Sequence, residues 1–461
     1  MTAPFGRRLC EVSANRAADG YRVFSLLDEE GPEPRPGQFY MLAAATHWAG
    51  EGERPFLPRA ISVAETGPAA AGTRLDFLVE GVGPGTDRLC ALEAGEAVWV
   101  TGPLGNAFAE PREVRAGAAG AILVGGGIGV APLALLRRSF GERGVPLRVL
   151  LGFRNREHSG GLDLFCGSGG DLCPEVRLAS EDGHRGHRGY VTDLLAAMLA
   201  GDDAESAVVY CCGPPAMLDA VAQLCDSRNV PCELAMESPM ACGYGACFGC
   251  AVPKPEGGYH RLCVDGPVMR SSAGGVVGGP TPEEALATAG GGGSPATTGP
   301  AAEAPSPIDF CGIRLDHPVI NASGTYDAIA ARKVFGDQLL EDFPFSAFVS
   351  KTITPEPRAG NAPQRIWETP AGMINSIGLP NKGLEGFLAA DLPLLAELPV
   401  PLIVSIMATS RPEFSRLVEA VGECEEVAAI ELNVSCPNVH SGLIVGEQPA
   451  ETEALLEALR P

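Results

Sequence analysis

Four cysteines carry the most specific chemical pattern in this chain. Three are spaced C-x4-C-x2-C and the fourth follows thirteen positions later; they are Cys242, Cys247, Cys250 and Cys263. This spacing is typical of plant-type [2Fe-2S] centres, in which a tight loop wraps three sulfur atoms around the cluster and a distant fourth completes it. Glycines at three intervening positions allow a positive φ, so backbone N–H groups can turn toward the sulfur atoms. A zinc site and a disulfide framework are the alternatives.

Because such a centre transfers single electrons, the rest of the chain is expected to supply an electron donor and an acceptor. The first hundred or so residues alternate like short strands, for example over 74–80 and 97–100, and predict a small antiparallel barrel. An arginine and a serine three positions apart can hold a pyrophosphate and the edge of a flavin ring, and a Gly-Thr pair can donate N–H groups to phosphate. A surface arginine beside a capping serine is the alternative. The candidate residues on this barrel are Arg59, Ala60, Ile61, Ser62, Phe77, Leu78, Gly85 and Thr86.

A glycine-rich turn follows a predicted buried strand at 120–124 and precedes a predicted helix at 130–138. Its glycines are Gly125, Gly126, Gly127 and Gly129. This order of strand, glycine turn and helix N-terminus is typical of a binding site for a dinucleotide pyrophosphate. The pattern departs from G-x-G-x-x-G, because Pro132 stands where the third glycine would be. Strands at 147–153 and 207–211, with helices at 191–199 and 216–225, extend the pattern to a parallel α/β sheet.

Composition restricts the partners and the compartment. The chain has 461 residues, enough for about three domains. Its 34 basic and 57 acidic residues give a formal charge of −23, which argues against nucleic acid or an anionic membrane as a partner. The start lacks the apolar core of a signal peptide, and glycines interrupt the uncharged run over 116–136, so no membrane span is predicted. We expect a cytoplasmic location.

The C-terminal third shows the rhythm of a β/α barrel. Buried strands are predicted at 319–325, 347–352, 401–407 and 429–436, with helical stretches between several of them. Polar residues stand at the ends of these strands, where such barrels collect their chemistry; they are Ser323, Lys351, Asn433 and Cys436. A structural cysteine and an ordinary rim lysine are the alternatives for Cys436 and Lys351. Residues 271–305, rich in Gly, Ala, Pro and Ser, predict a flexible linker.

The order of the motifs up to about residue 270 resembles the ferredoxin-reductase-like iron–sulfur flavoproteins, above all the electron-transfer subunit of class 1B dihydroorotate dehydrogenases. The motifs are the Arg59–Ser62 segment, Gly85-Thr86, the glycine turn, Cys212-Gly-Pro-Pro-Ala-Met217 and the cysteine loop. The resemblance implies FAD on the barrel, NAD on the α/β domain and a [2Fe-2S] cluster on the four cysteines. Arg154 and Arg156 leave NADP open, because they could bind a 2′-phosphate.

After the linker, two loops and one strand resemble class 1 dihydroorotate dehydrogenases. They are 433–438, 375–381 and 350–352. The resemblance implies that Cys436 is the catalytic base, that Lys351 contacts both FMN and substrate, and that the substrate is bound by Lys351, Asn375, Ser376, Ile377, Gly378, Leu379, Asn433 and Asn438. The implied FMN contacts are Ser323, Lys351, Thr352, Ser405 and Asn433. Ser405 stands where the family usually has an asparagine. Dihydropyrimidine dehydrogenases share a related cysteine loop, but the asparagines favour orotate.

These observations predict a multidomain chain. The expected domains are an FAD-binding β-barrel at 1–112, an NAD-binding α/β domain at 113–232, a [2Fe-2S] domain at 233–270, the linker at 271–305 and a truncated β/α barrel at 306–461. A complete barrel needs about 250 residues, so FMN and substrate binding by this chain are left open. The expected function is NAD-linked dihydroorotate oxidation in pyrimidine biosynthesis, in a homo-oligomer or with a separate catalytic subunit. A general NAD(P)H-dependent reductase and a docking module for a complete dehydrogenase are the alternatives.

Overall fold

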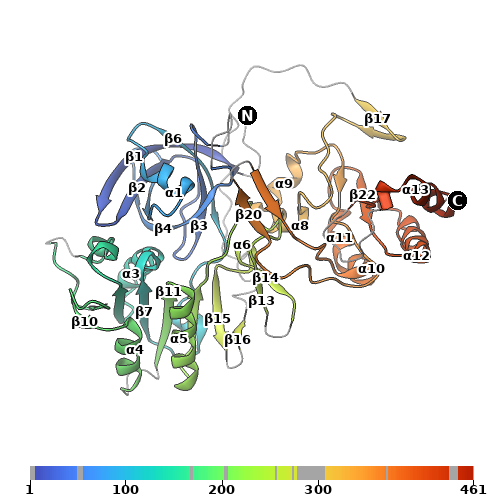
Figure 1. Cartoon of the computed structure of the whole chain (residues 1–461). Helices are drawn as coiled ribbons and strands as arrows, with labels where there is room; N and C mark the ends of the chain where they lie inside the picture. The colour runs from blue at the N-terminus through green and yellow to red at the C-terminus, as the bar shows by residue number, and fades with distance from the viewer. Residues whose placement is uncertain are drawn as a thin grey trace.

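The computed structural model describes residues 6–48, 55–166, 170–201, 206–254, 257–272, 275–277, 307–369, 372–435 and 445–459. Figure 1 shows a β-barrel and an α/β sheet on one side, the cysteine loop region in the middle and the C-terminal part on the other side. No helix among the described residues is long and apolar enough to cross a membrane.

The N-terminal barrel is closed by six antiparallel strands in the order β1-β2-β5-β4-β3-β6. They are β1 (Arg8–Ala18), β2 (Tyr21–Asp28), β3 (Phe39–Ala44), β4 (Arg59–Pro68), β5 (Thr73–Val79) and β6 (Ala97–Leu104). Apolar side chains fill the interior, where Tyr40 and Phe77 pack edge to face at 5.6 Å between ring centroids. Two short helices, α1 (Pro84–Cys90) and α2 (Pro111–Val114), complete this part. The predicted antiparallel barrel is confirmed.

The second layer is an eight-stranded sheet in the order β10-β9-β8-β7-β11-β12-β15-β16. The strands are β7 (Gly120–Gly126), β8 (Leu147–Phe153), β9 (Val176–Ser180), β10 (His187–Arg188), β11 (Ala207–Cys212), β12 (Cys232–Ala235), β15 (Val268–Ser272) and β16 (Gly275–Val277). From β10 to β12 the strands are parallel, as predicted, and β15 and β16 are antiparallel.

Three helices cover this sheet: α3 (Ala131–Glu142), α4 (Val191–Leu199) and α5 (Pro215–Ser227). Alternate residues of β7 face opposite sides of the sheet, so Leu123 joins one apolar core with α3 while Ile122 and Val124 join the other with α4 and α5. The strand order reverses between β7 and β11, and their carboxyl ends carry the glycine turn and Cys212. Ligands of open parallel sheets bind at such a switch point.

The cysteine-rich segment begins after β12 and ends before β15, two neighbouring strands of the α/β sheet. It contains β13 (Ala251–Pro253), β14 (Tyr259–Arg261) and α6 (Leu262–Asp265), with the cysteine loop before β13. The flanking strands β12 and β15 are hydrogen-bonded neighbours, so the segment is anchored at both ends. The predicted linker differs at its start, because β16 pairs with β15 within 271–277. The rest of the linker lies outside the described residues.

The C-terminal part contains a parallel three-stranded sheet in the order β19-β22-β23. Its strands are β19 (Phe348–Val349), β22 (Leu402–Ile406) and β23 (Val427–Leu432). The helices are α8 (Ala328–Phe335), α9 (Gln338–Glu341), α10 (Gly383–Gly386), η6 (Phe387–Asp391), α11 (Leu392–Leu395), α12 (Arg411–Gly422), η7 (Val445–Glu447) and α13 (Pro449–Leu459). Two hairpins, β17 (Ile308–Phe310) with β18 (Ile313–Leu315) and β20 (Ile366–Thr369) with β21 (Gly372–Asn375), lie outside this sheet. The alternation of parallel strands and helices fits part of a β/α barrel.

One predicted strand of this part is wrong. Residues 319–325 form no strand; instead the Asn321 side chain pairs with β19, donating to Val349 O at 2.8 Å and accepting from Val349 N at 2.8 Å. The amide side chain thereby takes the place of a backbone ladder, which explains why an apolar run with good strand composition remains irregular. The strand predicted to end at 436 ends at Leu432, and it is half-buried rather than buried.

Candidate functional site

The four cysteines predicted as cluster ligands come together in the structure. The sulfur atoms of Cys250 and Cys263 are 3.1 Å apart, and Cys263 N donates to Cys250 Sγ at 3.5 Å. Hydrogen bonds from Cys247 and Cys263 hold the pKa of the Cys242 thiol well below its ordinary value. The contact with Cys263 likewise lowers the pKa of Cys250. The same contacts raise the pKa of Cys247 and Cys263, so the thiolate, which is the form that binds metal, is favoured at Cys242 and Cys250.

The backbone of this loop turns its N–H groups toward the sulfur atoms. Gly245 N lies 3.1 Å from Cys263 Sγ and Gly249 N lies 3.4 Å from Cys247 Sγ. Gly245 has a φ of 89°, and a Cβ there would stand 2.8 Å from Ala330 Cβ. Among the described residues no three His, Cys, Asp or Glu side chains are arranged around a single ion. The inward N–H groups fit a two-iron cluster, whose sulfur atoms accept such hydrogen bonds. The four thiols fit it as well, because the contacts Cys247–Cys242, Cys242–Cys263 and Cys263–Cys250 link them.

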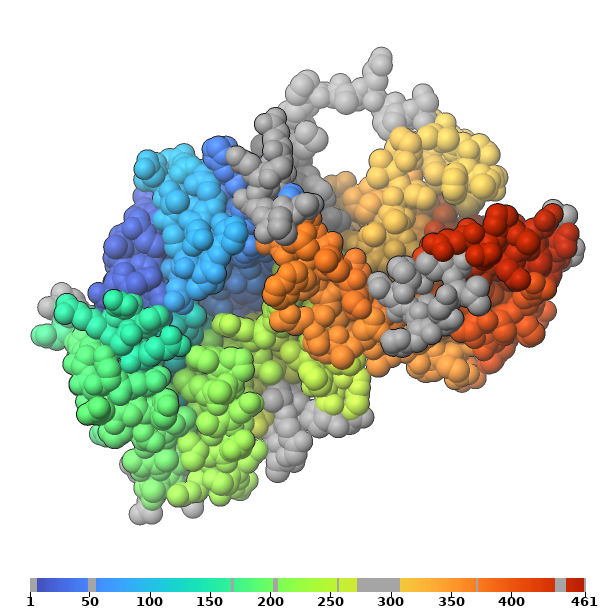
Figure 2. All heavy atoms as spheres, in the orientation of Figure 1, coloured from blue at the N-terminus to red at the C-terminus, as the bar shows by residue number. Residues whose placement is uncertain are grey.

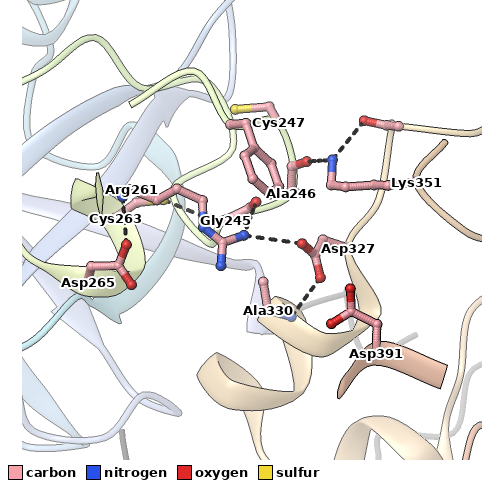
Figure 3. A network of polar contacts seen from close by, with 12 residues as sticks. Gly245, Ala246, Cys247, Arg261, Cys263, Asp265, Asp327, Ala330, Lys351 and Asp391 are labelled. Carbon is pink, nitrogen blue, oxygen red and sulfur yellow. Dashed lines mark hydrogen bonds and ion pairs between the residues drawn. The ribbon is translucent and has the colours of Figure 1, made fainter. Parts of the chain in front are cut away.

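The cysteine loop lies directly against the ends of the C-terminal strands. Lys351 Nζ, just after β19, donates to Ala246 O at 2.7 Å and lies 4.3 Å from the Phe248 ring centroid. Arg261 donates to Gly245 O and to Asp327, both at 3.1 Å (Figure 3). Burial lowers the pKa of Lys351, an effect that Asp327 opposes. The predicted FMN and substrate lysine is therefore also a contact of the predicted cluster loop.

Four residues predicted to contact FMN share one hydrogen-bond cluster. The Thr352 hydroxyl accepts from Asn433 Nδ2 at 2.8 Å and lies 3.0 Å from Ser405 Oγ and 3.1 Å from Ser323 Oγ. Thr352 and Ser405 are buried, while Ser323 and Asn433 are partly exposed. Ser405, which replaces the usual asparagine, thus still takes part in a hydrogen bond at this position. The structure brings these residues together beside Lys351.

The predicted substrate loop is placed only in part. Asn375 is exposed at the end of β21, whereas Ser376 Oγ accepts from Asn361 Nδ2 at 2.8 Å. Ser376 also lines an open hollow of about 580 Å³ formed mainly by 358–362, and this lining includes neither Lys351 nor Asn433. Ile377 O accepts from Asn361 N, and positive φ angles at Gly378 and Leu379 shape the following turn. Cys436 and Asn438 lie outside the described residues.

The predicted FAD motifs also assemble. A Cβ on Gly85 would stand 2.2 Å from Arg59 Nε, so the α1 turn and the start of β4 are in direct contact. The Thr86 hydroxyl accepts from Val82 N at 2.9 Å, which fixes the turn before α1. Phe77 and Leu78 are buried in apolar cores. Ala60, Ile61 and Ser62 pair with β3 in the barrel wall.

The glycine turn contacts the second motif of the α/β sheet. A Cβ on Gly129 would stand 2.6 Å from Cys212 O, and one on Gly126 would stand 2.5 Å from Met217 Sδ. Gly127 has a φ of 55° and Gly125 is packed within the sheet. Arg154, exposed in the turn after β8, and Arg156, exposed in η3 (Arg156–His158), lie where the sequence predicts them. The predicted dinucleotide-binding site would consist of the turn, the start of α3 and Cys212, which lie together.

A closed flavin-type barrel, a parallel sheet with a glycine turn and a four-cysteine loop define an iron–sulfur flavoprotein reductase of the ferredoxin-reductase-like class. Residues 123–223 match the family "Oxidoreductase NAD-binding domain", residues 237–273 match "Iron-sulfur cluster binding domain of dihydroorotate dehydrogenase B" and residues 307–460 match "Dihydroorotate dehydrogenase". The electron transfer subunit of dihydroorotate dehydrogenase B (NAD(+)) from Clostridium acetobutylicum is 37% identical over 257 residues, 56% of this chain and 92% of that protein. The chain belongs to the dihydroorotate dehydrogenase B electron transfer subunit family.

The C-terminal part has different relatives. The catalytic subunit of dihydroorotate dehydrogenase B (NAD(+)) from Desulforudis audaxviator is 42% identical over 157 residues, 33% of this chain and 49% of that protein. The chain is thus a fusion, and it spans about half the length of the curated catalytic subunits that it matches. A solved structure of an NADH-dependent reduced ferredoxin-NADP oxidoreductase covers 57% of this chain and 88% of its own, at 25% identity and a TM-score of 0.47.

Some residues at the contacts between the parts were missed by sequence reasoning. Glu368 of β20 accepts from Phe56 N at 2.6 Å and Leu57 N at 2.8 Å, and its other oxygen pairs with Arg59 at 2.6 Å. In Figure 2 the orange segment that includes β20 lies against the blue barrel. Asp327 pairs with Arg261 in the same way from α8's N-cap. The sequence signal nearest to these contacts is the C-x4-C-x2-C loop, and it does not mark Glu368 or Asp327.

Proposed function

We propose that this chain carries out NAD-linked oxidation of dihydroorotate in pyrimidine biosynthesis, with the first 270 or so residues as its electron-transfer module. The observation that carries the proposal is the 2.7 Å contact between Lys351 Nζ, at the predicted FMN site, and Ala246 O in the cysteine loop. This contact supports a short path between the two sites. The family memberships of both parts support the reaction itself.

For the [2Fe-2S] cluster, FAD, NAD and FMN, the residues proposed to hold each cofactor lie near one another. The four cysteines would bind the [2Fe-2S] cluster, Arg59 to Ser62 with Gly85 and Thr86 would bind FAD, and the turn from Gly125 to Gly129 would bind NAD. FMN would contact the cluster of hydroxyl and amide groups around Thr352. When bound, these groups supply one- and two-electron carriers between dihydroorotate and NAD, in the order FMN, [2Fe-2S] and FAD.

The chain's own residues prepare the proton and substrate chemistry. Lys351, half-buried and held by two carbonyl oxygens, is oriented at the strand end by the loop it contacts. We assign Asn375, Asn433 and Asn438 to hydrogen bonds with the pyrimidine, and the Cys436 thiolate to removal of the proton on the carbon next to the carbonyl. The domain limits 1–112, 113–232, 233–270, 271–305 and 306–461 and a cytoplasmic location belong to the same proposal.

The proposal is tested by coupling the two ends of the chain. Protein reconstituted anaerobically with iron, sulfide, FAD and FMN is given dihydroorotate and NAD, alone and with a complete dihydroorotate dehydrogenase B catalytic subunit. NADH formation in either arm supports the proposal, and formation with NAD but not NADP supports the choice of nucleotide. NADH-driven dye reduction without dihydroorotate-dependent NADH formation in both arms would support a general reductase instead.

A partner chain is a second proposal, and it is supported by relatives of both parts that are named as subunits of dihydroorotate dehydrogenase B. The proposed partner is a complete dihydroorotate dehydrogenase B catalytic subunit or a second copy of this chain. Mass measurement of the purified complex distinguishes the two. A single chain that forms NADH from dihydroorotate without any partner would contradict it.

A further inference from the structure

Three carbonyl groups on the outer side of the cysteine loop each accept a hydrogen bond from a different cation. Gly245 O accepts from Arg261 at 3.1 Å, Ala246 O from Lys351 at 2.7 Å and Phe248 O from Arg365 at 3.3 Å. The N–H groups of Gly245 and Gly249 point to sulfur atoms on the inner side. The peptide between Phe248 and Gly249 therefore has its carbonyl oxygen on a cation and its N–H group on a sulfur atom.

Arg365 is a cation to which the proposed function assigns no role. It is 2% exposed and is among the largest fully buried side chains of the described residues. It donates hydrogen bonds to the carbonyl oxygens of Asn361 at 2.7 Å, Ala359 at 3.0 Å and Phe248. It also has a hydrogen bond with the Tyr259 side chain, and its guanidinium lies 4.4 Å from the Tyr259 ring centroid. An arginine stays charged at neutral pH, so this is a buried positive charge whose hydrogen-bond acceptors here are neutral.

A buried charge with neutral partners is costly unless an opposite charge lies nearby. The four thiolates and two sulfides of a [2Fe-2S] centre outweigh two ferric ions, so the centre is an anion, and its reduction adds another negative charge. Arg365 contacts Phe248, the residue between Cys247 and Cys250. An anionic cluster in the loop would therefore offset the cost of burying the Arg365 charge beside it.

We propose that Arg365, supplied by the dehydrogenase part of the chain, is a positioning residue that fixes the Phe248 peptide and stabilises the reduced cluster. This inference rests on the proposed function. Its consequence is that the cluster's reduction potential is set partly by the dehydrogenase part and only partly by the electron-transfer module that holds the cysteines. Docking of the two parts and the electron affinity of the cluster are then linked.

The test is a potentiometric titration of the full reconstituted chain, followed by the EPR signal of the reduced cluster. Arg365→Met keeps the side-chain volume but removes the charge, and it lowers the ratio of reduced to oxidised cluster at a fixed potential by roughly fivefold to tenfold, as expected for one nearby charge. Arg365→Lys keeps the charge and stays closer to the wild type, although it loses the planar donor geometry. Arg416→Gln, an exposed charge on α12, is the control and leaves the potential unchanged.

The outcomes separate this inference from the proposed function. Wild-type potentials in both Arg365 variants, with intact EPR signals, overturn the inference and leave the function standing. Cluster loss in Arg365→Met with retention in Arg365→Lys supports it, because a cation is then required. Cluster loss in both variants overturns it and makes Arg365 a packing residue. Absence of any cluster from the reconstituted wild type refutes the proposed function itself.

Discussion

At the scale of single residues, the Thr352 hydroxyl is the shared hydrogen-bond partner at the candidate FMN site. The four thiols form the candidate cluster site. Thr352 joins Ser323, Ser405 and Asn433 within 3.1 Å, and each comes from the end of a different strand or segment. The sequence could indicate these positions because residues at strand ends of a β/α barrel share one rim. It could not show that they share a single hydroxyl, which depends on side-chain rotamers set by packing.

Replacing Thr352 by valine should destabilise the C-terminal part. The two side chains have nearly the same shape, but Thr352→Val leaves the amide of Asn433 and the hydroxyl of Ser405 without this buried partner. We expect a loss of about 2 kcal/mol in the free energy of unfolding, measured by chemical denaturation. Thr325→Val, at an exposed position, is the matched control and should cost about 0.5 kcal/mol or less. Equal effects of the two changes would contradict the described cluster.

Cys263→Ser should abolish the cluster. Cys263 is fully buried beside Cys250 and accepts from Gly245 N, so no other thiol among the described cysteines can replace it without moving this loop. Iron content and the visible absorption of the reconstituted chain should fall to background while bound FAD is retained. Cys311→Ser changes an exposed cysteine and should leave both signals at wild-type strength. A full iron content in Cys263→Ser would rule out the assigned ligand.

At the scale of elements, sequence periodicity predicted regular strands and helices well and irregular backbone poorly. The strand β8 and the helix α4 begin and end where they were expected, because both are amphipathic or apolar over their whole length. Residues 319–325 were predicted as a strand and are not one, because the Asn321 side chain supplies the pairing. A polar residue inside an apolar run can replace backbone hydrogen bonds, and composition alone does not reveal this.

The turn after β7 gives a prediction at the same scale. A Cβ on Gly129 would stand 2.6 Å from Cys212 O and 2.7 Å from Gly213 Cα, so Gly129→Ala must shift the backbone of the dinucleotide turn. We expect the rate of flavin reduction by NADH to fall by about tenfold, since small displacements of a bound reactant are costly. Stopped-flow absorbance of the flavin measures this rate, with FAD and iron contents as checks that the rest of the chain is intact.

Gly141→Ala is the matched control for this change. Gly141 lies within α3, and a Cβ there meets no atom within 4 Å. Alanine in a helix is more favourable than glycine by about 1 kcal/mol, so the variant should be slightly more stable than the wild type with an unchanged rate of flavin reduction. A slower rate in Gly141→Ala, or a wild-type rate in Gly129→Ala, would contradict the assigned role of the turn.

At the scale of the whole molecule, contacts between the parts were the feature that sequence reasoning could not find. The partners of Glu368, Arg365 and Asp327 are single backbone or charged groups that lie far away in the chain, and no local pattern marks them. The motifs that were found are short loops with fixed spacing. The fold classes and the cysteine loop were thus predictable, whereas the docking of the dehydrogenase part on that loop was not.

The Glu368 contact predicts a pH-dependent stability. Burial works against ionisation of this carboxyl, but hydrogen bonds from Leu57, Arg59 and Phe56 outweigh it and hold the pKa of Glu368 below its ordinary 4.5. A lowered pKa in the folded state means that the stabilisation is complete above pH 4.5 and is lost as the pH falls through the folded-state value. The difference in stability between wild type and Glu368→Gln, about 1 kcal/mol at neutral pH, should therefore shrink on acidification.

Thermal unfolding at several pH values, together with hydrogen exchange at the Phe56 and Leu57 amides, measures this effect. The amides should exchange faster in Glu368→Gln at neutral pH, because the carboxylate is their acceptor. Glu385→Gln, exposed on α10, is the control and should exchange like the wild type. A stability difference that grows as the pH falls would contradict the assigned direction.

The central claim is that one chain couples a nicotinamide-reducible flavin to a [2Fe-2S] centre held by the four cysteines. An anaerobic titration of the reconstituted chain with NADH, followed by flavin absorbance and by EPR in the same samples, tests it most directly. We expect bleaching of the flavin and the appearance of a reduced [2Fe-2S] signal as NADH is added. A flavin that bleaches while the cluster stays oxidised and EPR-silent at excess NADH, or a chain that binds no flavin, would contradict it.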